Sequence, residues 1–133
     1  MSEARIDQRI SILVYEDIES AFHYLTSVFG LGPGELSRAS DGSVVHGELQ
    51  VGEGQLWLHP ESEEFGLRSP RNMGGGARGM VVVLVDDVDA HHRHAVEQGA
   101  TIEYEPTDQD YGYREYGAVD LEGHLWSFMR QID

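Results

Sequence analysis

Two polar residues on one short stretch, His46 and Glu48, could supply an acid–base pair or a polar anchor for a ligand. One residue separates them, so in an extended strand both side chains point to the same side. An imidazole beside a carboxylate can take up a proton or hold a polar group of a ligand. The same pattern also fits a solvent-facing strand edge, so both interpretations remain open.

A second candidate region lies near the C-terminus, where aromatic and acidic residues alternate. Residues 103–122 hold seven acids and one Arg. Aromatic faces beside carboxylates suit a planar or cationic ligand, through stacking and cation–π contact. The alternative is an acidic, solvated loop with two strand-facing tyrosines. Arg114 could clamp a carboxylate or pair with a neighbouring acid. The candidate ligand-binding residues of this region are Tyr111, Tyr113, Arg114 and Tyr116.

The remaining reactive residue types narrow the chemistry. His91, His92 and His94 are predicted to lie on a solvated helix face, where only His91 and His94 share a side. No Ser-His-Asp pattern can be identified. The chain has no Cys, which excludes disulfides, thiolate metal sites and Cys nucleophiles. This composition fits a reducing cytoplasm.

The charge restricts the partners. Nine Arg and no Lys oppose 24 acids, which gives a net charge of −15 in 133 residues. Such a chain repels phosphate backbones, so we expect no nucleic-acid partner, and an anionic membrane surface is disfavoured. The polar N-terminus predicts no signal peptide, and we expect a cytoplasmic protein. A cationic small molecule or a basic protein remains a plausible partner.

The sequence repeats itself. The apolar run Ile10–Tyr15 recurs as Met80–Val85 at an offset of 70, and each run is followed by acids and a helical pattern. Glu53-Gly54-Gln55-Leu56-Trp57 recurs as Glu122-Gly123-His124-Leu125-Trp126 at an offset of 69. Two similar units are too few for a solenoid and indicate a duplicated module.

Each unit predicts one strand, one helix and three further strands. Asp17 and Asp87 are suited to cap the helices, and Gly30 and Gly99 to end them. The expected class is α+β, with two tandem βαβββ modules whose eight strands form a curved mixed-sheet cleft and whose helices cover the outer face. The predicted parts are residues 1–60, a linker at 61–79, and residues 80–133, in one compact domain. Alternation predicts that Trp57 and Trp126 face the helices.

This doubled module resembles the vicinal oxygen chelate superfamily, which includes glyoxalases, bleomycin-resistance proteins and extradiol dioxygenases. The resemblance rests on the helix entry Val14–Tyr24, on Asp86-Asp87-Val88-Asp89 with Gln98-Gly99-Ala100, and on Tyr111-Gly112-Tyr113-Arg114 with Asp120–Phe128. It covers nearly the whole chain. Because this scaffold carries many chemistries, the resemblance indicates the fold more strongly than the function.

The resemblance also locates the family's four metal-ligand positions. By spacing from the helix-capping Asp residues and from the last turn, these fall at Ile10, Met80 and Ser127. The internal offset of 69 places the fourth at Leu58 and predicts that Leu58 and Ser127 face the cleft. These side chains cannot hold a divalent ion as His or Glu would. We therefore expect no metal and no other cofactor.

Three functions remain open from the sequence. The first is a metal-free binding protein that sequesters a planar or cationic metabolite or antibiotic, with His46, Glu48, Leu58 and Ser127 in its cleft. The second is a glyoxalase-like lyase or isomerase, or a dioxygenase-type metalloenzyme, with shifted ligands chosen from His46, Glu48, His59 and His124. The third is an accessory protein for a basic partner. The resemblance further implies a homodimer whose ligand cleft spans both copies.

Overall fold

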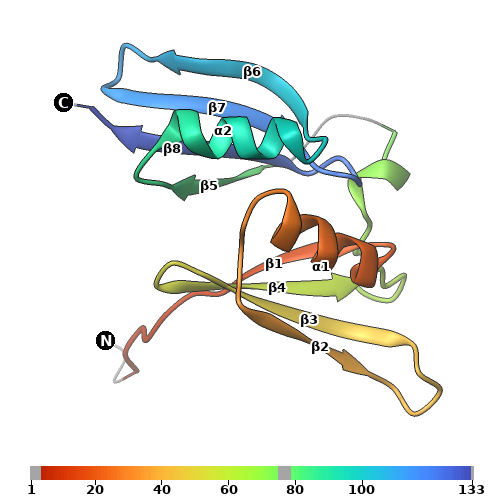
Figure 1. Cartoon of the computed structure of the whole chain (residues 1–133). Coiled ribbons are helices and arrows are strands. Elements are labelled where there is room, and N and C mark those ends of the chain that lie inside the picture. Colours follow the sequence, from red (N-terminus) through yellow and green to blue (C-terminus); the bar gives the residue numbers. More distant parts are fainter. Residues whose placement is uncertain (1–3, 75–78, 133) are drawn as a thin grey trace.

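The computed structural model describes residues 4–74 and 79–132 (Figure 1). Residues 75–78 of the predicted linker lie outside the described residues. The first module comprises β1 (Ser11–Tyr15), α1 (Ile18–Ser27), β2 (Gly34–Arg38), β3 (Val44–Val51) and β4 (Gly54–Pro60). The second comprises β5 (Met80–Leu84), α2 (Val88–Glu97), β6 (Thr101–Asp108), β7 (Tyr113–Val119) and β8 (Leu125–Gln131).

The two predicted βαβββ modules are confirmed. The eight strands form two four-stranded sheets, in the orders β1-β4-β3-β2 and β5-β8-β7-β6, rather than one continuous sheet. In each sheet the first strand runs parallel to the last, and the other pairs are antiparallel. The linker between the modules contains a short 3-10 helix at Pro70–Asn72.

Both helices begin where the sequence predicts. The carboxylate of Asp17 accepts the backbone N–H of Ser20, and that of Asp87 accepts the N–H of Ala90. These bonds satisfy donors that the first helical turn leaves unpaired. The apolar side of α1 then packs on its own sheet through Ile18, Ala21 and Leu25, all of them buried. Each helix therefore covers one face of one sheet and leaves the other face open.

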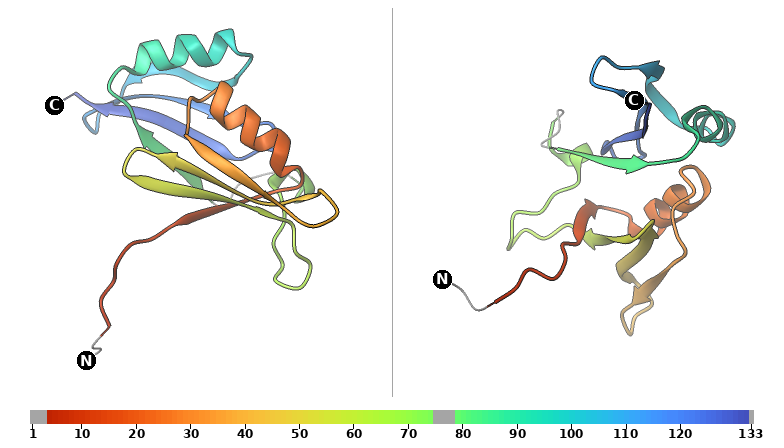
Figure 2. Two further views of the ribbon diagram at one scale, coloured as in Figure 1. Left: turned by 60° about the horizontal axis from the view of Figure 1, so that its bottom comes forward. Right: turned by 90° about the vertical axis from the view of Figure 1, so that its left-hand side faces the viewer.

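The two modules share one hydrophobic core. The ring of Phe29, just after α1, lies 5.3 Å from the ring of Trp126 and 4.9 Å from that of Phe128, both in β8. The helices lie side by side on one side of the molecule (Figure 2). Aromatic burial of this extent dominates core energetics, so we expect the two modules to unfold together.

The histidines of α2 form the predicted solvated face only in part, since His94 is exposed but His91 and His92 are partly buried. The half-buried His91 lies with Nε2 2.7 Å from the Phe29 carbonyl and Nδ1 2.7 Å from the Tyr116 hydroxyl. The His94 Nε2 lies 2.9 Å from the Ser27 carbonyl. Their acceptors lie at the end of α1, so these rings join the two modules. A contact between helices so distant in sequence has no local signal.

The position of His91 predicts a loss of stability in mild acid. Burial lowers the pKa of His91 below its ordinary value, the hydrogen bond to Phe29 opposes this, and the nearby His94 adds to it. The unfolded chain therefore binds more protons below about pH 6.5, so the free energy of unfolding decreases as the pH falls through that value toward the lowered pKa. Urea unfolding between neutral pH and pH 5.5 should show a shallower pH slope in His91→Gln than in the wild type. The exposed His23→Gln should keep the wild-type slope.

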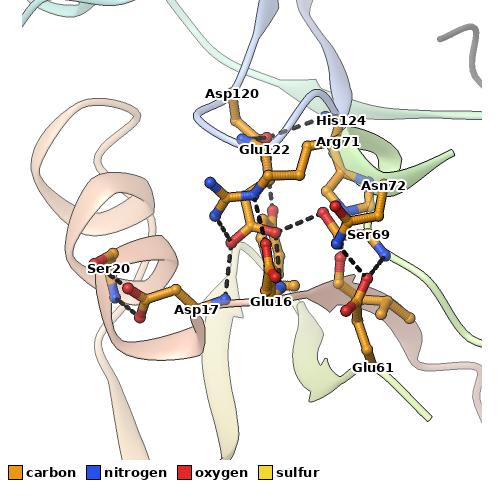
Figure 3. A network of polar contacts seen from close by, with 12 residues as sticks. Glu16, Asp17, Ser20, Glu61, Ser69, Arg71, Asn72, Asp120, Glu122 and His124 are labelled. Atoms are coloured by element: carbon orange, nitrogen blue, oxygen red, sulfur yellow. Dashed lines mark hydrogen bonds and ion pairs between the residues drawn. The ribbon is translucent and has the colours of Figure 1, made fainter. Parts of the chain in front are cut away.

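A buried polar network also joins the modules (Figure 3). The Tyr15 hydroxyl donates to Asp120 at 2.6 Å, and the Trp126 indole N–H donates to it at 3.0 Å. The same carboxylate accepts the backbone N–H groups of Glu122 and His124. Burial, and then the Asp120 charge, raise the pKa of Tyr15 well above its ordinary value. Tyr15 is therefore a neutral donor that holds β1 to the last turn of the second module.

The next acid in that turn, Glu122, closes the network. Its side chain is fully buried and accepts the backbone N–H groups of Glu16 and Asp17 at 2.7 and 2.9 Å. The Ser69 hydroxyl and the Arg71 guanidinium also donate to it. Burial alone would raise the pKa of Glu122, but these donors outweigh burial and lower it. One carboxylate thus holds the linker and both modules together.

Candidate functional site

The open face of the first sheet, the face turned away from α1, carries the His46 and Glu48 pair. The His46 Nε2 lies 2.9 Å from the Glu48 Oε2. The His46 ring also packs edge-on against Trp57, with a centroid distance of 5.3 Å. Glu48 lies opposite Trp57 in the register of β3 and β4. The predicted common side of His46 and Glu48 is confirmed, and Trp57 joins them there.

Two predicted orientations in β4 are wrong. Leu58 is fully buried, and it lies with Ile18 of α1 on the side of the sheet where a Cβ on Gly47 would point. Leu58 therefore belongs to the helix-side core and does not face the cleft. Trp57, predicted to face the helix, alternates with it and lies on the open face. Trp126 does pack under the helices, as predicted.

The open face of the second sheet carries a buried carboxylate that is not among the predicted ligand-binding residues. Glu115 in β7 is 4% exposed. Its Oε2 accepts the Ser127 hydroxyl at 2.6 Å and the Tyr104 phenol at 2.9 Å. Burial raises the pKa of Tyr104, hydrogen bonding to Ser127 opposes this, and the Glu115 carboxylate adds to it. Ser127, predicted to face the cleft, lies on this face, where its hydroxyl is already bound by Glu115.

Tyr104 can lie here only because residue 117 is glycine. A Cβ built on Gly117 would lie 2.2 Å from the nearest carbon of the Tyr104 ring, a separation that no pair of carbons tolerates. The ring therefore occupies the space that a side chain at residue 117 would need, while 38% of Tyr104 stays exposed.

This contact predicts that Gly117→Ala displaces the Tyr104 ring. The free energy of unfolding should fall by about 1–3 kcal/mol, the usual cost of an added methyl group in a filled space. In a Tyr104→Ala background the same substitution should have little effect, because the obstacle is gone. Urea unfolding of the four proteins in this double-mutant cycle measures the coupling. Equal costs of Gly117→Ala in both backgrounds would contradict the contact.

Arg114 and Tyr116 do not face the open side. Tyr116 is fully buried and bonds to His91 of α2. The Arg114 guanidinium donates to Asp89 of α2 and to Asp108 of β6, which is the neighbouring-acid pairing that the sequence left open. Since alternate residues of a strand point to opposite faces, Tyr113 and Glu115 take the open face and Arg114 and Tyr116 the helix face.

The tyrosines at the start of β7 form a pair. The rings of Tyr111 and Tyr113 have centroids 6.4 Å apart, and 59% of Tyr111 is exposed. They lie at the rim of the open face, beyond Glu115. The structure thus brings Tyr113 and Ser127 together with Tyr104 and Glu115, which belong to the aromatic and acidic segment but are not among its candidate ligand-binding residues.

Where the two modules meet, the open faces are apolar. The side chains of Ile12, Met80, Val82 and Leu84 are all about half exposed or more. A pocket of about 480 Å³ lies between β1 and β5 beneath the linker, which we call the seam pocket. Its lining includes Ile12, Val14, Leu67, Met80, His124 and Leu125. Arg68 adds a cation to this lining. An apolar hollow with a few polar groups is typical of a small-molecule site.

The family's metal-ligand positions carry no metal-binding set. Met80 lines the seam pocket, and Ser127 is bound to Glu115. By the true repeat of the modules the fourth position is Trp57. In residues 4–74 and 79–132, no three His, Asp or Glu side chains are grouped as a metal ion would require. Among the shifted candidates, His59 lies 2.6 Å from the Pro60 carbonyl and His124 lies 2.8 Å from the Val14 carbonyl.

The similarity to known proteins identifies the superfamily of this chain. Residues 6–128 match the model of the glyoxalase/bleomycin resistance protein/dioxygenase superfamily. The chain belongs to this superfamily. The uncharacterized protein Rv0887c of Mycobacterium tuberculosis is 32% identical over 125 residues, which cover 90% of this chain and 72% of that protein. Mb0911c of Mycobacterium bovis is also 32% identical and is covered to 80%.

Solved structures share this fold. The structure of TioX from Micromonospora sp. ML1 is similar, with a TM-score of 0.76 and 32% identity, covering 94% of this chain and 98% of that one. A glyoxalase/bleomycin resistance protein/dioxygenase family enzyme from Burkholderia phytofirmans has a TM-score of 0.72 at 19% identity, with 92% and 96% covered, and supports the fold alone. In the described residues, no helix has the length and apolar character needed to cross a membrane.

Proposed function

We propose that this superfamily member is a metal-free binding protein that sequesters a planar or cationic small molecule on the open faces of its sheets. The observation that carries the proposal is the apolar strip Ile12, Met80, Val82 and Leu84, which stays exposed beside the seam pocket. Contiguous exposed apolar surface of this kind marks a binding site. The residue types at Ile10, Trp57, Met80 and Ser127 support the absence of the family metal.

The charge and the aromatic residues support the ligand class. The net charge of −15 raises the local concentration of cations around the protein. On the open faces, Trp57, Tyr104 and Tyr113 offer ring surfaces close to the carboxylates of Glu48 and Glu115. A planar ligand gains stacking from the rings, and a positive charge gains from the acids.

A thermal-shift screen of the apo protein with cationic antibiotics and aromatic metabolites tests this function. We expect saturable stabilisation by at least one class, which follows ligand concentration by mass action. The matched variant is Val82→Glu, which places a charge in the apolar strip and should abolish the shift. The control is Val96→Glu, the same substitution at an equally exposed position of α2, and it should keep the ligand-induced thermal shift. The absence of any saturable shift across a broad panel would count against the function.

We propose in addition that the protein is a homodimer. The exposed apolar strip would be covered by a second copy, which would enclose a ligand between the two chains. The extended segment before β1 also exposes Ile6 almost completely, which supports a role for this segment in association. Sedimentation equilibrium should give twice the chain mass, and Leu84→Glu should give the mass of one chain. A monomer at all concentrations would contradict the dimer.

One contact favours a second candidate, a glyoxalase-like lyase or isomerase. His46 is held 2.9 Å from Glu48 beside an aromatic wall, an arrangement that can orient a ring for proton transfer. Turnover of a glutathione hemithioacetal, abolished in His46→Gln, would favour this enzyme over the binding protein. Ligand binding without turnover would favour sequestration.

A further inference from the structure

Glu115 offers a carboxylate oxygen to an incoming ligand on the open face. Among the described residues it is one of three buried acids, with Asp120 and Glu122, and 4% of its surface is exposed. Its neighbour in sequence, Arg114, points to the opposite face and pairs with Asp89 and Asp108. A buried carboxylate is costly unless a cation or several donors satisfy it. The surroundings of Glu115 therefore indicate which kind of ligand group could bind there.

The two donors that Glu115 has both bind one oxygen. Ser127 and Tyr104 donate to Oε2, and Oε1 has no hydrogen-bond partner among the described residues. An ionised carboxylate only accepts hydrogen bonds, and it has about four acceptor positions. The free oxygen lies on the open side of the sheet, where an arriving N–H donor could reach it.

Apolar side chains and an aromatic ring neighbour Glu115 on the open face. Met129 lies opposite Glu115 in the register of β7 and β8, and Val82 lies opposite Ser127. The Tyr104 ring lies against Gly117, and its hydroxyl donates to the carboxylate. A partly exposed ring thus ends at the carboxylate of a buried residue, where a charge-assisted hydrogen bond from a ligand would be strong.

We propose that Glu115 and Tyr104 form the recognition element for a planar organic cation, which donates an N–H to Oε1 of Glu115 while its ring system stacks on Tyr104. This inference rests on the proposed binding function, and adds to it the two recognising residues and the required N–H donor. Ser127 is a positioning residue that holds the carboxylate in place. The element explains why residue 117 is glycine, since any side chain would displace the ring.

The test compares two probes with the same ring system, 9-aminoacridine as the cationic N–H donor and acridine as the neutral analogue. Both are titrated into the full chain at a pH where only the first is charged, and at physiological ionic strength, so that unspecific attraction to the acidic surface is screened. The wild type should bind 9-aminoacridine about 10- to 100-fold more tightly than acridine, as expected for a hydrogen bond to a charged group. Glu115→Gln should reduce this ratio to about threefold or less and leave the affinity for acridine unchanged.

A matched control and a second variant complete the test. Glu97→Gln removes the same charge from the exposed side of α2 and should keep the wild-type ratio. Tyr104→Leu should weaken both probes about tenfold, because stacking serves both, and it does so independently of whether Glu115→Gln folds. A wild-type ratio in Glu115→Gln, or unchanged affinities in Tyr104→Leu, would overturn the recognition element while probe binding itself stands. No saturable binding of either probe to the wild type would instead contradict the proposed function as well.

Discussion

Replacing Glu122 with Ala lowers the free energy of unfolding by about 3 kcal/mol, because it removes a buried carboxylate and leaves two backbone N–H groups and the Ser69 hydroxyl without their acceptor. The side chain of Glu122 is fully buried, and it accepts two backbone N–H groups at the junction of β1 and α1. It also receives Ser69 and Arg71 from the linker. Urea unfolding at neutral pH measures the loss.

The matched control for Glu122 is Glu64, another acid of the same chain. Glu64 lies exposed in the linker, and Glu64→Ala should change stability by about 0.5 kcal/mol or less. Glu122→Gln separates charge from shape, since the amide can accept some of these hydrogen bonds but repels donors with its NH₂ group. An intermediate loss is expected. If Glu122→Ala were as stable as Glu64→Ala, the network of Figure 3 would not hold the modules together.

Replacing Phe29 with Ala is expected to cost about 3–5 kcal/mol, as for other large aromatic residues in cores. Phe29 is 1% exposed and follows α1, yet its nearest aromatic partners are Trp126 and Phe128 of the other module. The substitution therefore removes packing between the modules and leaves a cavity. Urea unfolding measures the loss of stability, and the near-ultraviolet circular dichroism of the aromatic residues should show the change in their packing.

Phe65 supplies the same substitution at an exposed place. Because 71% of Phe65 is exposed in the linker, Phe65→Ala should leave stability nearly unchanged. Phe29→Ala should also unfold both modules in one transition, since the core is shared. A loss as small as that of Phe65→Ala would show that other contacts hold the modules together, and two separate transitions would show that each module unfolds on its own.

The repeat made most of the fold predictable. Helix caps at Asp17 and Asp87 and apolar strands before them recur at an offset of 70, and the structure places them in equivalent positions. The split into two sheets was not predictable, because hydrogen bonds between β1 and β5 depend on how the modules pack. Packing in turn depends on contacts such as Phe29 with Trp126, which carry no local sequence signal.

The error at Leu58 has a specific physical cause. The local match of the two Trp-containing segments has an offset of 69, whereas the helix-facing side chains repeat at 70, with Leu56 and Leu58 matching Trp126 and Phe128. The turns differ in length, since Val51 pairs with Gly54 but Val119 pairs with Leu125. A one-residue difference in register moves a side chain to the other face. The matching residues of the two segments therefore do not point their side chains to the same face of their sheets.

The second open face was predicted in part. Tyr113 and Ser127 lie on the open face, as a role in ligand binding requires, whereas Arg114 and Tyr116, whose prediction rests on side-chain chemistry, lie on the helix face. Strict alternation along the strand from Tyr113 places Arg114 on the other face and Glu115 on the open face. Alternation alone therefore predicts the position of Glu115 on the open face. The role of Tyr104 had no such signal, because irregular pairing between β6 and β7 sets its position over Gly117.

The most direct test of the account is to locate a bound ligand on the protein. In an amide chemical-shift titration of the isotope-labelled chain with 9-aminoacridine, we expect saturable shifts at open-face positions such as Val82, Glu115 and Ser127. Amides of the exposed side of α2, including Glu97, should stay unchanged. Shifts centred on the helices, or none that saturate, would contradict the claim that the open faces of the sheets are the binding site.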